Sequence, residues 1–356
     1  MKLAISLGAR GLGRVWPNPA VGCVIVSDGR IVGRGWTADG GRPHAETVAL
    51  ANAGSSARGA TAYVTLEPCA HHGNTPPCAD ALITAGIARV VTALVDPDPR
   101  VAGKGHSMLQ DAGVEVITGI EQAAAKGMHA GFLKRIQNGR PMVTLKLASS
   151  FDGRIATATG ESQWITGPEA RRMVHLMRAR HDAVMVGGGS ARSDDPSLTV
   201  RDLGIARQPV RVVCSKLLDL PLSGKLAITA KDVPLWLCHG ARADPALQDA
   251  WNGLGARLLS CEVRGGLLDP ASIFQALGDA GLTRVFCEGG GAFAASLLGA
   301  GVVDELVGFT AGIGIGAEGL PSLGPLGLQR LAAAPRFELV ECRQLGNDVM
   351  HRWARR

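Results

Sequence analysis

The sequence has few aromatic residues and no long apolar run. Phe, Trp and Tyr make up 4% of the 356 residues, with a single tyrosine, so few side chains are available for single-stranded bases to stack on. The longest uncharged apolar stretch covers residues 289–303 and includes five glycines, whereas a membrane-spanning helix needs about 20 apolar residues. We therefore expect neither a nucleic-acid-binding nor a membrane protein.

Strong charge and a secretory signal are also missing. The formal net charge is +6, and the longest basic runs are pairs such as Arg171-Arg172, which suits phosphorylated small molecules at least as well as nucleic acid. Gly8 and Arg10 interrupt the apolar N-terminus, so we expect no signal peptide. A cytoplasmic location is therefore expected. The eight cysteines are scattered, which favours free thiols or metal ligands over disulfides.

The composition is that of a packed globular protein. Hydrophobic residues make up 46% and charged residues 19% of the chain, and the length favours two domains. Apolar strand-like runs alternate with helical stretches, which predicts an α/β fold. Asn138-Gly139-Arg140-Pro141 has the turn chemistry of a boundary. We therefore predict domains at 1–140 and 141–356.

Each predicted domain contains several elements. In the first, the predicted strands are 22–26, 62–65 and 89–94, and the predicted helices are 45–53, 79–85 and 120–136. In the second, the predicted strands are 142–148, 182–186, 210–213, 235–238, 256–259, 284–287, 305–309, 337–342 and 349–353. Thr166 and Glu169 form a capping-box pattern before a helix at 168–180, and Asp269-Pro270 opens another helix. The last two strands have no helix between them, so an antiparallel pair and a mixed sheet are expected.

Four residues of the first domain predict a metal-dependent reaction. His44, Cys69 and Cys78 offer an imidazole and two thiolates, the ligands that zinc prefers, and three protein ligands leave one position for water. Glu46 lies two residues after His44. A carboxylate there can move protons between water, a ring nitrogen and leaving ammonia, as in zinc deaminases.

Each of these signals is weak when taken alone. An H-x-E sequence arises by chance, and a buried cysteine is more often part of a core than a ligand. Their order along the chain, after a predicted strand, favours the deaminase. One departure is that eight residues separate Cys69 from Cys78, whereas the usual signature ends in P-C-x-x-C, so the second thiolate has to return through a loop.

The residues 65–78, TLEPCAHHGNTPPC, resemble the long zinc motif of the bifunctional riboflavin-biosynthesis deaminase/reductases. Further segments along nearly the whole chain are similar to this family: PNPAVG at 17–22, KLASSFDG at 146–153, GESQWIT at 160–166, DDPSLTVR at 194–201 and EGGG at 288–291. The resemblance implies a cytidine-deaminase-like N-terminal domain followed by a dihydrofolate-reductase-like mixed-sheet domain.

The resemblance also implies the activity and the ligands. The first domain would use Zn²⁺ to deaminate 2,5-diamino-6-(5-phosphoribosylamino)pyrimidin-4(3H)-one. The second would use NADPH to reduce the ribosyl group to ribityl, giving 5-amino-6-(5-phosphoribitylamino)uracil. The implied partner is thus a phosphorylated pyrimidine, with no nucleic acid and no membrane, and a homo-oligomer is expected.

Site residues follow from the matching motif positions. In the first domain these are His44, Cys69 and Cys78 on zinc, Glu46 as proton donor, and Asn18 and His71 at the pyrimidine. The implied cofactor-binding residues of the second domain are Ala148, Trp164, Ser190, Asp194, Ser215, Gly290 and Gly291. The implied substrate-binding residues are Ser162, Arg178, Leu198, Arg201 and Glu288. For His71, a hydrogen bond that braces the loop is the structural alternative.

The glycine runs are consistent with a dinucleotide site. Gly289-Gly290-Gly291 follows a predicted strand and opens an apolar helix at 292–298, so bare backbone N–H groups can bind phosphates. A formal G-x-G-x-x-G at 314–319 is interpreted as a loop, because Pro321 follows where a helix would run. Arg192 and Lys216 are both candidates for binding the NADPH 2′-phosphate.

Some residues depart from the family pattern. Thr37 stands where a histidine is expected, which puts one phosphate contact in question, while Ser190 replaces a threonine and Phe151 a leucine. Two other classes remain open: a nucleic-acid or free-base zinc deaminase with a non-catalytic second domain, and a binding or scaffold protein. The first predicts stacking aromatics and a basic channel, and the second predicts a damaged zinc site.

Overall fold

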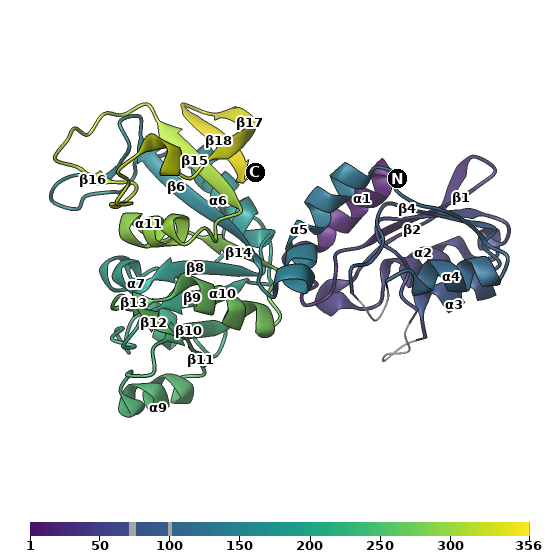
Figure 1. The fold of residues 1–356 in the computed structure, drawn as a ribbon, viewed down its shortest axis with the longest axis horizontal. Helices are drawn as coiled ribbons and strands as arrows, with labels where there is room; N and C mark the ends of the chain where they lie inside the picture. The colour runs from purple at the N-terminus through teal and green to yellow at the C-terminus, as the bar shows by residue number, and fades with distance from the viewer. Residues whose placement is uncertain (71–75, 99–101, 356) are drawn as a thin grey trace. The chain divides into compact units, whose positions relative to one another are not determined.

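The computed structural model describes residues 1–70, 76–98 and 102–355. The chain forms two compact units, Met1–Gly139 and Arg140–Arg356, each built on an open β-sheet with flanking helices (Figure 1). This arrangement confirms the predicted α/β class. Within the described residues, no helix combines the length and the apolar character needed to cross a bilayer.

The first unit is a five-stranded sheet between two layers of helices. The strands lie in the order β2-β1-β3-β4-β5, with β1 antiparallel to β2 and β3, and β3, β4 and β5 parallel. Their bounds are β1 Gly22–Ser27, β2 Arg30–Trp36, β3 Thr61–Val64, β4 Arg89–Thr92 and β5 Glu115–Ile117. The helices are α1 Lys2–Gly8, α2 Ala45–Ala53, α3 Cys78–Thr84, α4 Lys104–Asp111 and α5 Gln122–Asn138.

Alternating side chains of β1 pack against the helices on the two faces of the sheet. Cys23 and Ile25 pack toward α2 and α3, whereas Val24 packs toward α1, because successive side chains of a strand point to opposite faces. Helices α2, α3 and α4 lie on one face of the sheet and α1 and α5 on the other (Figure 1).

Two glycines of β2 allow α2 to lie against the sheet. A Cβ on Gly33 would stand 2.2 Å from the carbonyl oxygen of Ala49, and one on Gly35 would stand 2.2 Å from that of Ala45. Any other residue would push the helix away. Since α2 starts directly after His44, this close packing fixes the start of the helix at the predicted metal site.

The second unit contains a nine-stranded sheet in the order β11-β10-β9-β8-β14-β6-β15-β18-β17. The first seven strands of this order are parallel, and β18 and β17 are antiparallel additions at one edge, which confirms the predicted mixed sheet. The strand bounds are β6 Met142–Ser150, β8 Ala183–Gly187, β9 Val210–Cys214, β10 Leu235–His239, β11 Arg257–Ser260, β14 Arg284–Cys287, β15 Glu305–Ala311, β17 Phe337–Leu345 and β18 Asp348–Arg355.

Helices and short strands complete this unit. The helices are α6 Pro168–Ala179, α7 Gly188–Asp194, α8 Lys225–Ile228, α9 Pro245–Gly253, α10 Pro270–Asp279 and α11 Gly291–Gly299. Two small antiparallel pairs are β7 Arg154–Ala156 with β16 Leu320–Pro321, and β12 Val263–Arg264 with β13 Leu267–Leu268. Because the carboxyl ends of parallel strands lie at one edge, the loops that follow β6, β8, β9 and β14 come together there.

Candidate functional site

The three predicted zinc ligands converge in the first unit. His44 immediately precedes α2, Cys69 lies in the segment after β3, and Cys78 is the first residue of α3. The His44 Nδ1 atom lies 3.2 Å from Cys78 Sγ and 3.7 Å from Cys69 Sγ, and all three ligand atoms lie within 4.8 Å of one another. The fold therefore joins side chains from three separate segments.

These distances fit a tetrahedral zinc ion. With Zn–N near ~2.05 Å and Zn–S near ~2.3 Å, tetrahedral angles place N and S about 3.5 Å apart, close to both separations given above. A hydrogen bond from Cys78 lowers the pKa of the Cys69 thiol to about 4, so Cys69 is a thiolate at neutral pH, the form that binds metal. The donor set and its geometry suit zinc with one position left for water.

The Glu46 carboxyl lies beside this cluster in a dry environment. Its side chain is buried in the first turn of α2, and burial raises its pKa to about 7, against the opposing effect of His44. A carboxyl group with this pKa exchanges protons readily at neutral pH, as a general acid or base does.

A second buried carboxylate supports the segment that carries Cys69. Glu67 accepts hydrogen bonds from four backbone N–H groups, those of Asp96, Gly103, Gly105 and His106, at 2.9 to 3.3 Å. A Cβ on Gly105 would stand 1.9 Å from the Pro68 carbonyl oxygen. Glu67 therefore connects the segment before α4 and the start of α4 to the residues next to the metal ligand, a role that the sequence reasoning missed.

The remaining predicted residues of the first unit are less closely defined. The Asn18 amide packs against Gly41, three residues before His44, and Gly41 has φ +90° and no room for a Cβ there. The Thr37 hydroxyl accepts a hydrogen bond from the Val21 N–H at 2.9 Å and donates to the Pro19 carbonyl at 3.0 Å, so it braces the segment after Asn18. His71 lies outside the described residues.

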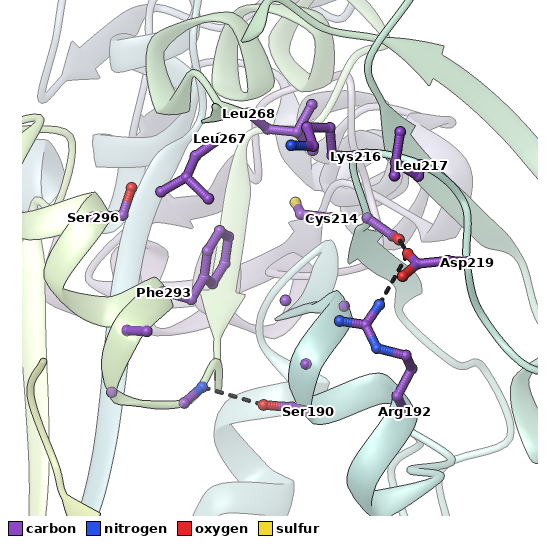
Figure 2. Close-up of a pocket in the computed structure, with 17 residues that line it drawn as sticks. Ser190, Arg192, Cys214, Lys216, Leu217, Asp219, Leu267, Leu268, Phe293 and Ser296 are labelled. Atoms are coloured by element: carbon purple, nitrogen blue, oxygen red, sulfur yellow. Dashed lines mark hydrogen bonds and ion pairs between the residues drawn. The ribbon is translucent and has the colours of Figure 1, made fainter. Parts of the chain in front are cut away.

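In the second unit, one cavity lies over the carboxyl ends of β9, β8 and β14 (Figure 2). Its volume of about 460 Å³ is in the range of small-molecule sites. Of the predicted cofactor residues it contains Ser190, Ser215, Gly290 and Gly291, and the two phosphate candidates Arg192 and Lys216 also line it. The Gly290 N–H donates to Ser190 Oγ at 3.3 Å, directly before α11.

A second cavity lies over β6 and the end of β14. It is lined by four predicted substrate residues, which are Ser162, Arg178, Arg201 and Glu288, and by the predicted cofactor residues Ala148 and Trp164. Trp164 and Ala148, predicted as cofactor residues, thus line the same cavity as the predicted substrate residues and do not line the glycine-rich cavity. The turn that begins at Glu288 continues into Gly290, so that a single turn borders both cavities.

A partly buried charge cluster of Arg178, Lys146 and Glu288 lines the second cavity. Glu288 receives hydrogen bonds from Arg178 Nε at 2.5 Å and Nη2 at 3.1 Å, and the Lys146 Nζ atom lies 3.5 Å from it. Burial disfavours the Glu288 carboxylate, but the charges of Arg178 and Lys146 outweigh it and lower its pKa to about 2. Glu288 is therefore ionised throughout the neutral range.

Two predicted residues do not line either of these cavities. Leu198 is buried at 3% exposure in the hydrophobic core beside Val184 and Val186. Asp194 ends α7 and accepts a hydrogen bond from the Ser193 hydroxyl at 2.6 Å. Neither residue is among those that line the two cavities.

The structure adds residues that sequence reasoning did not single out. Lys146, Arg171 and His175 line the second cavity, and Asp219 lines the first. The Arg171 guanidinium lies 4.7 Å from the centre of the Trp164 ring. His175 Nδ1 accepts a hydrogen bond from the backbone N–H of Arg201 at 3.2 Å. A cluster of basic residues on α6, the longest helix near the cavity, was the available sequence signal.

The glycine-rich segment at 314–319 is a loop, as predicted. The Ile315 and Gly316 N–H groups donate to the Asp152 carboxylate, the latter at 2.7 Å. Since a protein carboxylate already accepts these hydrogen bonds, the segment does not offer them to a dinucleotide phosphate.

Comparisons with known proteins agree with this division of sites. Residues 1–94 match the cytidine and deoxycytidylate deaminase zinc-binding region, and residues 141–351 match the RibD C-terminal domain. The chain is 44% identical to the riboflavin biosynthesis protein RibD of Escherichia coli, over 98% of this chain and 96% of that protein.

Solved structures agree as well. Acinetobacter baumannii RibD is 38% identical with a TM-score of 0.89, over 100% of this chain and 97% of that one. A Thermotoga maritima diaminohydroxyphosphoribosylaminopyrimidine deaminase/5-amino-6-(5-phosphoribosylamino)uracil reductase is 34% identical with a TM-score of 0.87, over the same shares of the two chains. The chain therefore belongs to the RibD family of bifunctional riboflavin-biosynthesis deaminase/reductases.

Proposed function

We propose that this chain deaminates 2,5-diamino-6-(5-phosphoribosylamino)pyrimidin-4(3H)-one and then reduces the ribosyl group, giving 5-amino-6-(5-phosphoribitylamino)uracil. The observation that carries the proposal is the convergence of His44, Cys69 and Cys78 at zinc-like separations beside the buried Glu46. An intact set of this kind also argues against a binding or scaffold protein, and few aromatics argue against a nucleic-acid substrate.

For the deamination, His44, Cys69 and Cys78 would hold the zinc, which lowers the pKa of water at its open position. Glu46 takes a proton from the attacking water and passes it to a nitrogen of the pyrimidine ring. Glu46 then takes the second proton of that water from the hydroxyl group now on the ring carbon and gives it to the departing amino group, which leaves as ammonia as the carbonyl forms. Asn18, and His71 by its motif position, would hold the ring.

For the reduction, Ser190, Ser215, Gly290 and Gly291 would hold NADPH, which supplies a hydride to the sugar C1. The backbone N–H groups at the start of α11 suit the dinucleotide phosphates. In the neighbouring cavity, Arg201 would bind the sugar phosphate. Lys146, an ammonium group beside Glu288, can donate a proton to the ring oxygen as the furanose opens.

Two further expectations belong to this proposal. All eight cysteines are free, as in proteins of a reducing compartment, which supports a cytoplasmic location. The hairpin of β17 and β18 exposes Leu339, Val340 and Val349 at the sheet edge, which supports the expected homo-oligomer, since exposed edges and apolar patches favour association. Sedimentation of the purified chain measures its oligomeric state.

One paired assay tests the proposed function. Metal analysis of the purified chain should find about one zinc per chain, and the aminopyrimidine phosphate should be consumed with release of ammonia and then with oxidation of NADPH. Ammonia release without NADPH oxidation would favour a deaminase with a non-catalytic second domain. Active protein without zinc would contradict the proposed site.

A further inference from the structure

The strand order indicates which end of the NADPH molecule lies over which strand, and this inference rests on the proposed reductase activity. The substrate cavity contains Lys146 and Ala148 of β6 and Glu288 after β14. Hydride transfer requires the nicotinamide to contact the substrate, so the nicotinamide would lie at the β14 side of the other cavity. Because the order there is β9-β8-β14-β6, the adenosine end would lie over β9.

Three charged groups lie at this adenosine end. Lys216 and Asp219 follow β9, and Arg192 comes from α7 and lies beside Asp219 on the same side of the cavity (Figure 2). Arg192 Nη1 lies 2.9 Å from Asp219 Oδ1, and the Ser215 hydroxyl donates to the same oxygen at 2.7 Å. A Cβ on Gly188 would stand 3.1 Å from Arg192 Nη1, so the glycine leaves space for the guanidinium.

The two cations have different surroundings. The Lys216 ammonium donates a hydrogen bond to the Gly266 carbonyl at 2.6 Å and so holds the turn between β12 and β13. Leu267 and Leu268 of β13 line the cavity. Arg192 is oriented by Asp219 through one nitrogen. The guanidinium has five N–H donors in a planar fork, which leaves others for a phosphate.

The chemistry of the adenosine ribose separates the two coenzymes. A carboxylate accepts the ribose 2′-hydroxyl of NADH, whereas an arginine binds the 2′-phosphate of NADPH. This cavity holds both groups in contact with each other. We propose that Arg192 determines the coenzyme preference: its guanidinium neutralises Asp219 and binds the 2′-phosphate, and without it Asp219 makes the cavity an NADH site.

Binding measurements with three full-length variants test this proposal, using NADPH, NADH, 2′,5′-ADP and ADP as probes and fluorescence titration as the readout. Arg192→Met should weaken NADPH and 2′,5′-ADP by about 10- to 100-fold, the effect of losing a charge-assisted contact, and leave NADH within threefold. Asp219→Asn should weaken NADH more than NADPH. Lys216→Met should change both coenzymes by the same factor, because it loosens a wall that both contact.

The outcomes separate the inference from the proposed function. If wild-type protein binds neither coenzyme, the reductase proposal fails. If it binds NADPH but Arg192→Met keeps the ratio of the two dissociation constants within threefold of wild type, or Lys216→Met shifts that ratio more than Arg192→Met does, the assignment of Arg192 is overturned. Because all three substitutions lie in the second unit, an unchanged circular dichroism spectrum and an unchanged urea unfolding curve show that this unit of each variant is folded.

Discussion

Glu46 is the single side chain on which the proposed deamination depends most directly. Glu46→Gln keeps the shape of the buried side chain but removes its proton exchange, so the deamination rate should fall by about 10²- to 10⁴-fold while zinc content stays near one per chain. Cys78→Ser serves as the comparison, because it removes a ligand and should lower zinc content and activity together. Zinc analysis and ammonia release measure both. Near-normal turnover of Glu46→Gln would mean that another group moves the proton.

Glu67 stabilises the residues around the metal without belonging to the ligand set. Both of its carboxylate oxygens accept hydrogen bonds from backbone N–H groups. In a glutamine side chain an NH₂ group stands in place of one of these oxygens and cannot accept such a bond. Glu67→Gln should therefore lower the free energy of unfolding by about 1–3 kcal/mol and speed the loss of zinc to a chelator.

The matched control for this change is Glu115→Gln in the same unit. Glu115 forms an ion pair with Arg89 at 2.7 Å, but both side chains are about half exposed, and such pairs contribute little to stability. Urea unfolding and the rate of zinc release measure the two variants. Equal effects of both substitutions would show that Glu67 does not hold the Cys69 segment.

At the scale of elements, the contact of β2 with α2 depends on glycine. Gly35→Ala places a methyl group 2.2 Å from the Ala45 carbonyl oxygen, so we expect a loss of about 1–3 kcal/mol of stability together with weaker zinc binding. Gly127→Ala in α5, where a Cβ meets nothing within 4 Å, should be neutral or slightly stabilising. Thermal unfolding compares the two, and similar behaviour would contradict the close packing.

The connection between α6 and β8 should make stability depend on pH. Burial lowers the pKa of His181 to about 3, with its ring nitrogens facing the Met177 carbonyl and the Thr144 hydroxyl. Between pH 6.5 and 3 the unfolded chain binds a proton that the folded chain does not, so His181 makes stability fall as pH decreases. His181→Gln should reduce the slope of the unfolding free energy against pH by up to about 1.4 kcal/mol per pH unit. Urea unfolding at pH 7 and at pH 5 measures this slope. An unchanged slope would exclude this group.

The sequence predicts elements well where the signal is local. Every strand of the nine-stranded sheet overlaps a predicted strand. The central parallel strands β8, β9 and β10 are buried along their whole length, and such strands appear as continuous apolar runs. Helix α4 was missed, since its first N–H groups are satisfied by Glu67, far away in the sequence. The capping box at Thr166 was wrong for a similar reason: α6 starts after Gly167, whose N–H donates to Asp348.

The same distinction holds for the sites. The zinc ligands could be predicted because their residue types and order are unusual along the chain. Lys146 on a strand, Asp219 in a loop and Glu67 beside the metal segment carry no such local signal. Their contribution arises from partners that are distant in sequence, such as Glu288, Arg192 and the start of α4.

At the scale of the molecule, the two reactions should be chemically separable. All proposed zinc-site residues lie in the first unit and all proposed reductase residues in the second. Glu46→Gln protein supplied with 5-amino-6-(5-phosphoribosylamino)uracil should therefore oxidise NADPH at the wild-type rate. Arg201→Ala should impair this reduction by losing about 1.5–3 kcal/mol of phosphate binding and leave ammonia release nearly unchanged. Loss of both steps in either folded variant would require a shared site.

The turn from Glu288 to Gly291 borders both cavities of the second unit, so its conformation enters the binding free energy of two ligands. A dinucleotide that favours one conformation of the Gly290 end would favour the same conformation at the Glu288 carboxylate, where the sugar would bind. Each ligand would then raise the affinity of the other, and linkage requires the two factors to be equal. The reductase would therefore favour its ternary complex over either binary one, and a cell rich in NADPH would capture the pyrimidine at lower concentrations.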